Sequence, residues 1–144
     1  MILLTFQGFS QDINIRKKEF LLDKGTAISG YDPTAYFSGK AQKGKKEFSY
    51  TQEGVNYQFV NANNLETFKK NSTKYEPQYG GWCAYAMGSK GDKVEVDPET
   101  FKIVNGKLYL FYHTIFSNTL TDWNKDENAF KTKADANWTK FIKR

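Results

Sequence analysis

The chain is poor in cysteine, histidine and proline, and it lacks a long apolar run. Its 144 residues include one Cys, one His and three Pro. A single cysteine excludes an intrachain disulfide framework, and one cysteine with one histidine cannot complete a Cys/His structural zinc site within a monomer. The mean hydropathy is −0.70, and no apolar stretch approaches the ~20 residues that cross a bilayer. We therefore expect no integral membrane segment.

A strong charge of one sign is also missing. The sequence holds 21 Lys and Arg against 16 Asp and Glu, which gives a net charge of +5. The Gly- and Lys-rich segment 39–46 lacks the spacing of a phosphate-binding loop. Lysines next to aromatic strands are typical of single-strand nucleic-acid binding, but here the alternation puts the rings on one face, where a helix needs them as its core. We expect no nucleic-acid partner.

What the chain has in plenty is aromatic side chains, with 12 Phe, 9 Tyr and 3 Trp. Rings of this size can fill one core, and the length suits a single domain. No internal repeat or low-complexity linker is evident. We predict a domain over residues 27–144, preceded by an N-terminal arm over residues 1–26. The first ten residues, MILLTFQGFS, have the small residues of a signal-peptide cleavage site at positions 8 and 10. This favours an exported protein, periplasmic or extracellular; the alternative is a loosely packed arm.

Hairpin and helix signals alternate along the domain. Aromatic and polar residues alternate on both sides of Gln52-Glu53-Gly54, which predicts a hairpin over 47–60. Asn105-Gly106 predicts the tight turn of a second hairpin over 101–112. Helix caps and apolar spacing predict helical segments at 34–37, 62–71, 114–124 and 127–142. The sequence therefore predicts an α+β domain, with a small antiparallel sheet from the two hairpins packed against several helices.

One segment differs from ordinary scaffold, and it surrounds the single cysteine: YGGWCAYAMG, residues 79–88. The two glycines permit a sharp turn, and the residues after them are compatible with a short helix that has Cys83 in its first turn. Unpaired N–H groups there favour the thiolate. Tyr79, Trp82 and Tyr85 flank the thiol as possible walls of a pocket. The alternative is that Cys83 is a small buried hydrophobe among core aromatics.

The segment 27–75 resembles the YHS domain family. The resemblance rests on Gly30-Tyr31-Asp32-Pro33, Phe48-Ser49-Tyr50, Tyr57-Gln58-Phe59 and Lys74-Tyr75-Glu76-Pro77. With the segments 75–86, 106–110 and 133–138, most of the chain is similar, in order, to the exported YHS-domain (seleno)protein subgroup. On this resemblance, residues 27–144 are a YHS-like domain with a C-terminal helical extension.

The resemblance implies less about function. In metal-handling YHS modules, cysteines follow the Asp-Pro motif and the aromatic strand; here Thr34, Val60 and Asn64 stand at those places. A metal role is therefore not inherited there. The position of Cys83 is selenocysteine in some members of the subgroup, which implies that the chemistry of sulfur or selenium matters at this site.

Two classes of function follow. The first is a binding module, monomeric or weakly dimeric, that captures a soft metal ion such as copper or zinc, or a small ligand, through the Cys83 thiolate with His113 as a further metal ligand. The residues expected to line that site are Tyr31, Asp32, Tyr79, Trp82 and Tyr85. The second is a thiol redox or peroxide-reactive protein with Cys83 as the catalytic group, and a non-catalytic interaction domain is a further alternative. No base is evident beside Cys83 in the sequence, so an enzyme has little support.

Overall fold

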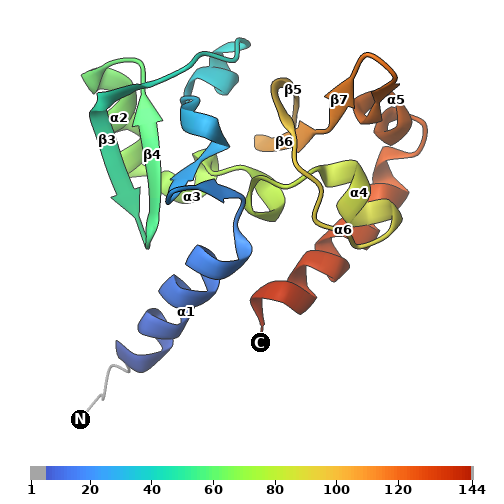
Figure 1. Cartoon of the computed structure of the whole chain (residues 1–144), viewed down its shortest axis with the longest axis horizontal. Helices are drawn as coiled ribbons and strands as arrows, with labels where there is room; N and C mark the ends of the chain where they lie inside the picture. The colour runs from blue at the N-terminus through green and yellow to red at the C-terminus, as the bar shows by residue number, and fades with distance from the viewer. Residues whose placement is uncertain (1–5, 144) are drawn as a thin grey trace.

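The computed structural model describes the backbone of residues 6–143 and the side chains of residues 13–143. Helices, 3-10 helices (η) and short strands alternate along the chain (Figure 1). In order they are α1 (Phe6–Glu19), β1 (Leu22–Asp23), β2 (Thr26–Ala27), η1 (Ile28–Gly30), η2 (Ala35–Ser38), β3 (Lys45–Gln52), β4 (Val55–Phe59), α2 (Ala62–Lys70), α3 (Ser72–Tyr75), η3 (Gln78–Gly81), α4 (Ala84–Ser89), β5 (Asp97–Val104), β6 (Lys107–Phe111), β7 (His113–Thr114), β8 (Ser117–Asn118), α5 (Thr119–Asn124) and α6 (Glu127–Ile142). The predicted single α+β domain is confirmed.

Both predicted hairpins form, but they do not share a sheet. The β3–β4 hairpin belongs to a four-stranded sheet of order β1-β2-β4-β3, whereas β5–β6 and β7–β8 are separate two-stranded sheets. The prediction of one antiparallel sheet is wrong in this detail. The reason is that the free edge of β4 is taken by β2, which runs parallel to it through the pair Thr26 and Asn56. Figure 1 shows the β3–β4 hairpin at the left of the molecule and the β5–β6 hairpin nearer its middle.

The structure contains one arrangement twice, although the sequence shows no repeat. We call residues 26–70 the first unit and residues 77–124 the second unit. Each unit opens with a residue that pairs in parallel with the second strand of its own hairpin, Thr26 with Asn56 and Pro77 with Leu108. The register of both hairpins shifts at matching places, between Lys45 and Ser49 in the first and between Asp97 and Phe101 in the second.

Each unit continues into a turn of three residues with positive φ. These φ values are 56°, 51° and 83° over residues 28–30, and 58°, 62° and 91° over residues 79–81. An extended aromatic residue follows each turn, Tyr31 in the first unit and Trp82 in the second. Next comes a fully buried residue, Asp32 or Cys83, whose side chain accepts the N–H of the residue three positions later, in the first turn of a short helix. Non-glycine residues seldom adopt positive φ, so the backbone of this turn is specified by its packing.

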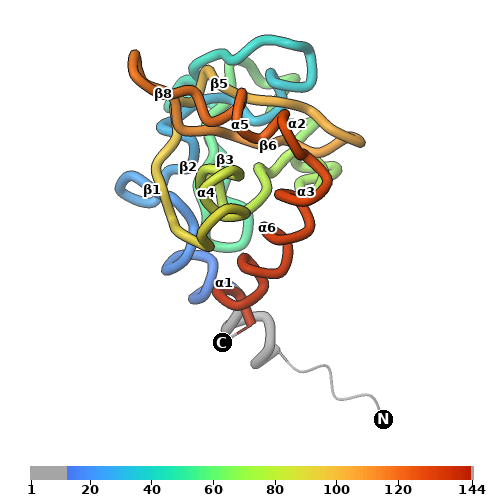
Figure 2. The backbone as a smooth tube through the Cα atoms, turned by 90° about the vertical axis from the view of Figure 1, so that its right-hand side faces the viewer, coloured from blue at the N-terminus to red at the C-terminus, as the bar shows by residue number. Residues whose placement is uncertain are grey.

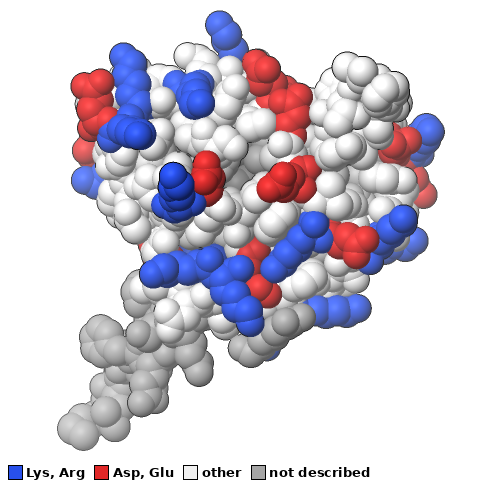
Figure 3. All heavy atoms as spheres, viewed as in Figure 1, with Lys and Arg blue, Asp and Glu red and all other residues white. Residues whose placement is uncertain are grey.

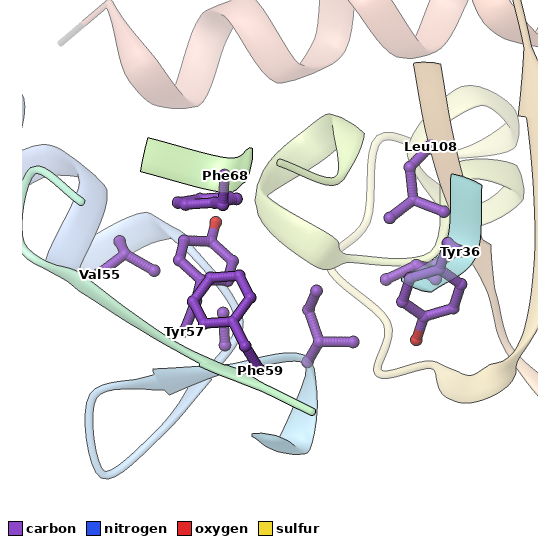
Figure 4. Packing of buried hydrophobic residues seen from close by; sticks show 9 residues of the cluster. Tyr36, Val55, Tyr57, Phe59, Phe68 and Leu108 are labelled. Carbon is purple, nitrogen blue, oxygen red and sulfur yellow. The ribbon is translucent and has the colours of Figure 1, made fainter. Parts of the chain in front are cut away.

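Two hydrophobic clusters fill the interior. In the first, the rings of Tyr57 and Phe59 lie against Phe68 of α2, with ring centroids 4.9 and 5.1 Å apart (Figure 4). Leu108 and Leu110 of the second unit belong to the same cluster. The second cluster surrounds Trp123, Tyr109 and Phe111 and includes Ala134 of α6. Because strand β6 contributes to both clusters, the two units form one domain.

Two boundaries differ from the prediction. Residues 114–124 are not one helix: β7 and β8 pair first, and α5 begins at Thr119 after the Asn118 cap. The structured part also begins before the predicted boundary at residue 27, because β1 joins the first sheet and Leu21 donates its N–H to Gly80 O at 3.0 Å. Of the expected export signal, residues 1–5 and the side chains up to residue 12 lie outside the described residues.

Candidate functional site

Cys83 lies in the interior, with no exposed surface. It is the N-cap residue of α4, one position before the predicted first turn, and its Sγ accepts the N–H of Ala86 at 3.5 Å. The hydroxyl of Thr119 is 3.4 Å from the sulfur. The glycine-containing turn at residues 79–81 places Cys83 between α4 and α5, and the thiol fills the space where these two helices meet. Both functions expected of Cys83 need a sulfur that a metal ion or an oxidant can reach, and the structure instead encloses it.

His113 has other surroundings. Its side chain is 40 % exposed; Nδ1 is 2.8 Å from the Thr100 hydroxyl and 3.9 Å from an Asp97 oxygen. Cys83 bonds to Ala86 and Thr119, whereas His113 bonds to Thr100, so their hydrogen bonds do not bring the two side chains to one site. Within residues 13–143, no group of three or more His, Cys, Asp or Glu side chains is placed to hold a metal ion.

The aromatic residues around Cys83 do not line a common pocket beside the sulfur. Tyr79 donates its hydroxyl to Asp135 of α6 at 2.8 Å, and Trp82 donates its indole N–H to the carbonyl of Glu19 at 2.6 Å. The ring of Tyr85 packs edge-on against Phe130 of α6, with centroids 4.9 Å apart. These side chains connect η3 and α4 to the C-terminal end of α1 and to α6. Burial raises the pKa of Tyr79, and the hydrogen bond to Asp135 raises it further.

Asp32 is also buried, and protein donors surround its carboxylate. Oδ1 accepts the N–H and hydroxyl of Thr34, at 2.8 and 2.6 Å, and the N–H of Ala35 at 3.3 Å. Oδ2 accepts the N–H of Val60 at 2.9 Å and the side-chain amide of Asn64 at 2.8 Å. Thr34, Val60 and Asn64 are the residues named above in the comparison with metal-handling YHS modules. In this chain they converge on a carboxylate, which is engaged in structure rather than free for a ligand. Tyr31, next to it, pairs with Lys43 in an isolated bridge.

A cleft of about 430 Å³ opens elsewhere, between α1, η3 and α6. Figure 2 shows α1 and the C-terminal part of α6 close together at one end of the molecule. Three rings line the cleft, those of Phe20, Tyr79 and Trp138. The rings of Phe20 and Trp138 lie 5.9 Å apart, and Ile15 and Ile142 add further apolar surface. Tyr79 is the one predicted binding residue that lines this cleft.

A largely buried ion pair lies in the same cleft. Arg16 Nη2 is 2.6 Å from Glu76 Oε2, and the two side chains are only 15 % and 12 % exposed. Arg16 also donates to the carbonyls of Gln52 and Glu53, and its guanidinium lies 4.5 Å above the Phe20 ring. The hydroxyl of Tyr57 donates to the same Glu76 oxygen at 2.6 Å. Burial raises the pKa of Tyr57, and the charge of Glu76 raises it further.

Gly80 allows the rings of Phe20 and Trp138 to lie close to the backbone of η3. A Cβ at this position would meet Trp138 at 2.8 Å and Phe20 at 3.0 Å, and the φ of 62° is one that side chains rarely adopt. A glycine is therefore needed for the two rings to approach the backbone of η3 from both sides.

Sequence reasoning missed the cleft because residues 1–26 were expected to form an arm. A local signal was present: Arg16 and Phe20 are four residues apart and so lie on one face of a helix. Glu76, by contrast, is 60 residues away from Arg16, and only folding brings it there. Comparisons of the chain with protein-family models, curated proteins and solved structures gave no match. The candidate site therefore rests on its own geometry and chemistry.

Proposed function

We propose that this chain is a YHS-like binding module that holds a small organic molecule in the cleft between α1 and α6. One observation carries the proposal: three aromatic rings and a largely buried Arg16–Glu76 pair meet in a single cleft. Small-molecule sites have volumes of ~300–1,000 Å³ and combine apolar walls with a few polar groups that fix orientation. The binding module expected from the sequence is retained, but its site moves from Cys83 to this cleft.

The charges of the cleft favour an amine as the ligand. Two carboxylates, those of Glu53 and Glu76, line it against one guanidinium. Arg16 already donates to three protein oxygens, whereas Oε1 of Glu76 receives no hydrogen bond from the described residues. The aromatic face of Trp138 also attracts cations, whereas that of Phe20 already holds the Arg16 guanidinium. The ligand class is therefore an organic amine with an apolar body.

The test compares two probes of similar shape and opposite charge, 2-phenylethylamine and 3-phenylpropionate, by NMR titration of the ¹⁵N-labelled protein. We expect the amine to shift the Gly80 amide and the Trp138 indole resonance, with a dissociation constant of about 1 mM or below, a normal affinity for so small a ligand. The carboxylate should leave both resonances in place.

Variants separate a specific site from loose adsorption. Glu53→Gln removes a cleft carboxylate, and Glu66→Gln is the control because Glu66 is 59 % exposed on α2 and does not line the cleft. We expect weaker amine binding only in Glu53→Gln. Equal shifts with both probes, no shifts with either, or equal loss in both variants would each overturn the proposal.

A function of the thiol is the second candidate. It is favoured by one contact, the N–H of Ala86 donated to the sulfur at the N-terminus of α4, because such donors stabilise a thiolate. Metal binding or peroxide reduction by Cys83 requires the junction between α4 and α5 to open. The reactivity of the thiol in the folded protein, treated in the Discussion, tests this directly.

A further inference from the structure

The two most exposed large apolar side chains of the described residues are neighbours. Ile115 is 92 % exposed and Phe116 is 91 % exposed. They form the turn between β7 and β8, and we call residues 112–118 the finger. Figure 2 shows the segment beside β8 projecting from the body of the molecule. Two neighbouring apolar side chains that are exposed to water on a projecting segment indicate an interaction surface.

The finger is an addition to the repeated unit. In the first unit only Val60 and Asn61 separate the end of β4 from α2. In the second unit the whole finger lies between the end of β6 and α5. Since the first unit completes the same arrangement without such a segment, closing the fold does not require the finger.

The finger is nevertheless held in a defined shape. Its two strands pair through His113 with Asn118 and Thr114 with Ser117. At the tip, the Thr114 hydroxyl accepts the N–H of Phe116 at 3.3 Å. At the base, Thr119 donates both its N–H and its hydroxyl to the carbonyl of Tyr112, at 3.1 and 2.7 Å. The apolar pair is thus presented outward by a hydrogen-bonded support.

The chemistry of the finger fits a lipid surface. From Leu108 to Thr121 the sequence has no Asp, Glu, Lys or Arg, and its single titratable cation is His113 at the base. Figure 3 shows uncharged atoms covering the projection at the corner where Figure 1 places β7. Insertion of the tip therefore buries no formal charge in hydrocarbon. Tyr112, 36 % exposed at the base, is of a residue type that favours the membrane–water interface.

We propose that the finger inserts Ile115 and Phe116 into the interface of a lipid bilayer and holds the protein reversibly on a membrane surface. The convex tip has two apolar side chains pointing outward, which fluid lipid can surround from every side. This interaction is with the surface alone: no helix of the described residues is long and apolar enough to cross a membrane. It does not depend on the function proposed for the cleft.

The experiment uses phosphatidylcholine vesicles and the full chain. We expect the wild type to sediment with vesicles. Burial of one Phe is worth enough to change partitioning about 10-fold or more, so Phe116→Ser should reduce binding by at least that factor, and the double variant with Ile115→Ser should reduce it further. Lys107→Ser, at the exposed turn of the other hairpin, is the matched control and should bind like the wild type. Because Ile115 and Phe116 are exposed, these variants keep the fold, which circular dichroism checks.

A second measurement reports on the tip itself. In Phe116→Trp, the new indole should shift its emission to shorter wavelength on adding vesicles and should be quenched by brominated lipid. The proposal is overturned if the wild type does not bind phosphatidylcholine, if Phe116→Ser binds as well as the wild type, or if binding needs anionic lipid and vanishes in high salt. It is also overturned if the finger variants change only the concentration-dependent mass of the protein, since the finger would then be an interface between copies of this chain.

Discussion

The two units close the same turn with different chemistry. In the first unit the buried residue after the turn is Asp32, whose carboxylate accepts five hydrogen bonds, from Thr34 and Ala35 at the start of η2, from Val60 after β4 and from Asn64 of α2. In the second unit the buried cap is Cys83, whose sulfur accepts one N–H and touches one hydroxyl. The first junction is held by hydrogen bonds to a charged group, and the second by packing.

This difference indicates that Cys83 stands at a structural position. Cys83 occupies the slot that a structural carboxylate fills in the first unit, and its backbone N–H binds a loop carbonyl as that of Asp32 does, Val94 O at 2.9 Å against Gln42 O at 2.8 Å. In the second unit α4, which begins directly after Cys83, packs against α6. That same helix supplies Trp138 to the cleft.

The largest expected effect is alkaline destabilisation, to which both units contribute. Burial raises the pKa values of Tyr36, Tyr57 and Tyr79 above the usual 10.0. Below pH 10 these tyrosines are neutral whether the chain is folded or unfolded. As the pH rises above 10, the unfolded chain loses protons that the folded chain keeps, so the free energy of unfolding should fall by about 1.4 kcal/mol per pH unit for each tyrosine, or about 4 kcal/mol for all three.

Urea unfolding between pH 9 and 11 measures this slope. Tyr57→Phe tests the first unit and Tyr79→Phe the second, and each should lower the slope by about 1.4 kcal/mol per pH unit. Burial also raises the pKa of Tyr109, so a part of the slope remains in every such variant. Tyr112→Phe is the exposed control. If the slope stays the same in both buried variants, the tyrosines are not the cause.

The next largest effect on stability distinguishes the two buried residues, Asp32 and Cys83. Asp32→Ala leaves the buried donors of Thr34, Val60 and Asn64 without their acceptor, so it should lower the free energy of unfolding by about 3 kcal/mol or more. Cys83→Ala, the matching truncation in the second unit, removes one weak acceptor and little volume and should cost about 1–2 kcal/mol. Denaturant unfolding of both variants measures the difference, and equal losses would show that the two junctions are held alike.

Gly80→Ala should cost about 2 kcal/mol, because it combines an unfavourable φ with a close approach to Trp138 and Phe20. Gly25→Ala is the matched control: its φ is 87°, but nothing lies within 4 Å of the added Cβ. The difference in thermal stability between Gly80→Ala and Gly25→Ala measures the contribution of the packing around Gly80. A loss in Gly25→Ala as large as that in Gly80→Ala would contradict the tight packing at the cleft.

The smallest stability effect is expected for Cys83→Ser, under about 1 kcal/mol, because serine is a good N-cap. Iodoacetamide should modify Cys83 far more slowly in the folded protein than in denaturant, since reaction requires the junction to open. Mass spectrometry of the Cys83 peptide follows the reaction. Rapid modification of the folded protein would instead favour the thiol function.

The parts of the fold that were predicted correctly have local causes. Asn105-Gly106 forms the turn between β5 and β6 with φ values of 52° and 74°, as that residue pair favours. Asn61 caps α2 through the N–H of Asn64. The finger was missed because we assigned Ile115 to one helical stripe with Leu120 and Trp123, although residues five apart lie on different faces of a helix. Both hydrogen bonds that close the base of the finger run from Thr119 to the Tyr112 carbonyl.

The repeat and the cleft had no such local signal. Ile28 and Ser29 are not residues that favour positive φ, so the first turn could not be matched to the glycine-containing second one. Arg16 and Glu76 are far apart in the sequence, and their types alone do not show that they pair. A reactive thiol was expected because Cys83 was predicted to lie in the first turn of a helix, with Tyr79 and Trp82 among the possible walls of a pocket. The hydroxyl of Tyr79 and the indole of Trp82 instead bond to α6 and α1.

The α+β class, the two hairpins and helices α2 and α6 follow from local signals in the sequence, because turn residues, caps and periodicity act over a few neighbouring residues. Only the tertiary structure decided which buried residue holds each unit together, that Cys83 is enclosed, and that a cleft forms between α1 and α6. These properties depend on contacts between distant segments, whose free energy arises when water is excluded and donors meet acceptors, and no local pattern encodes which segments will meet.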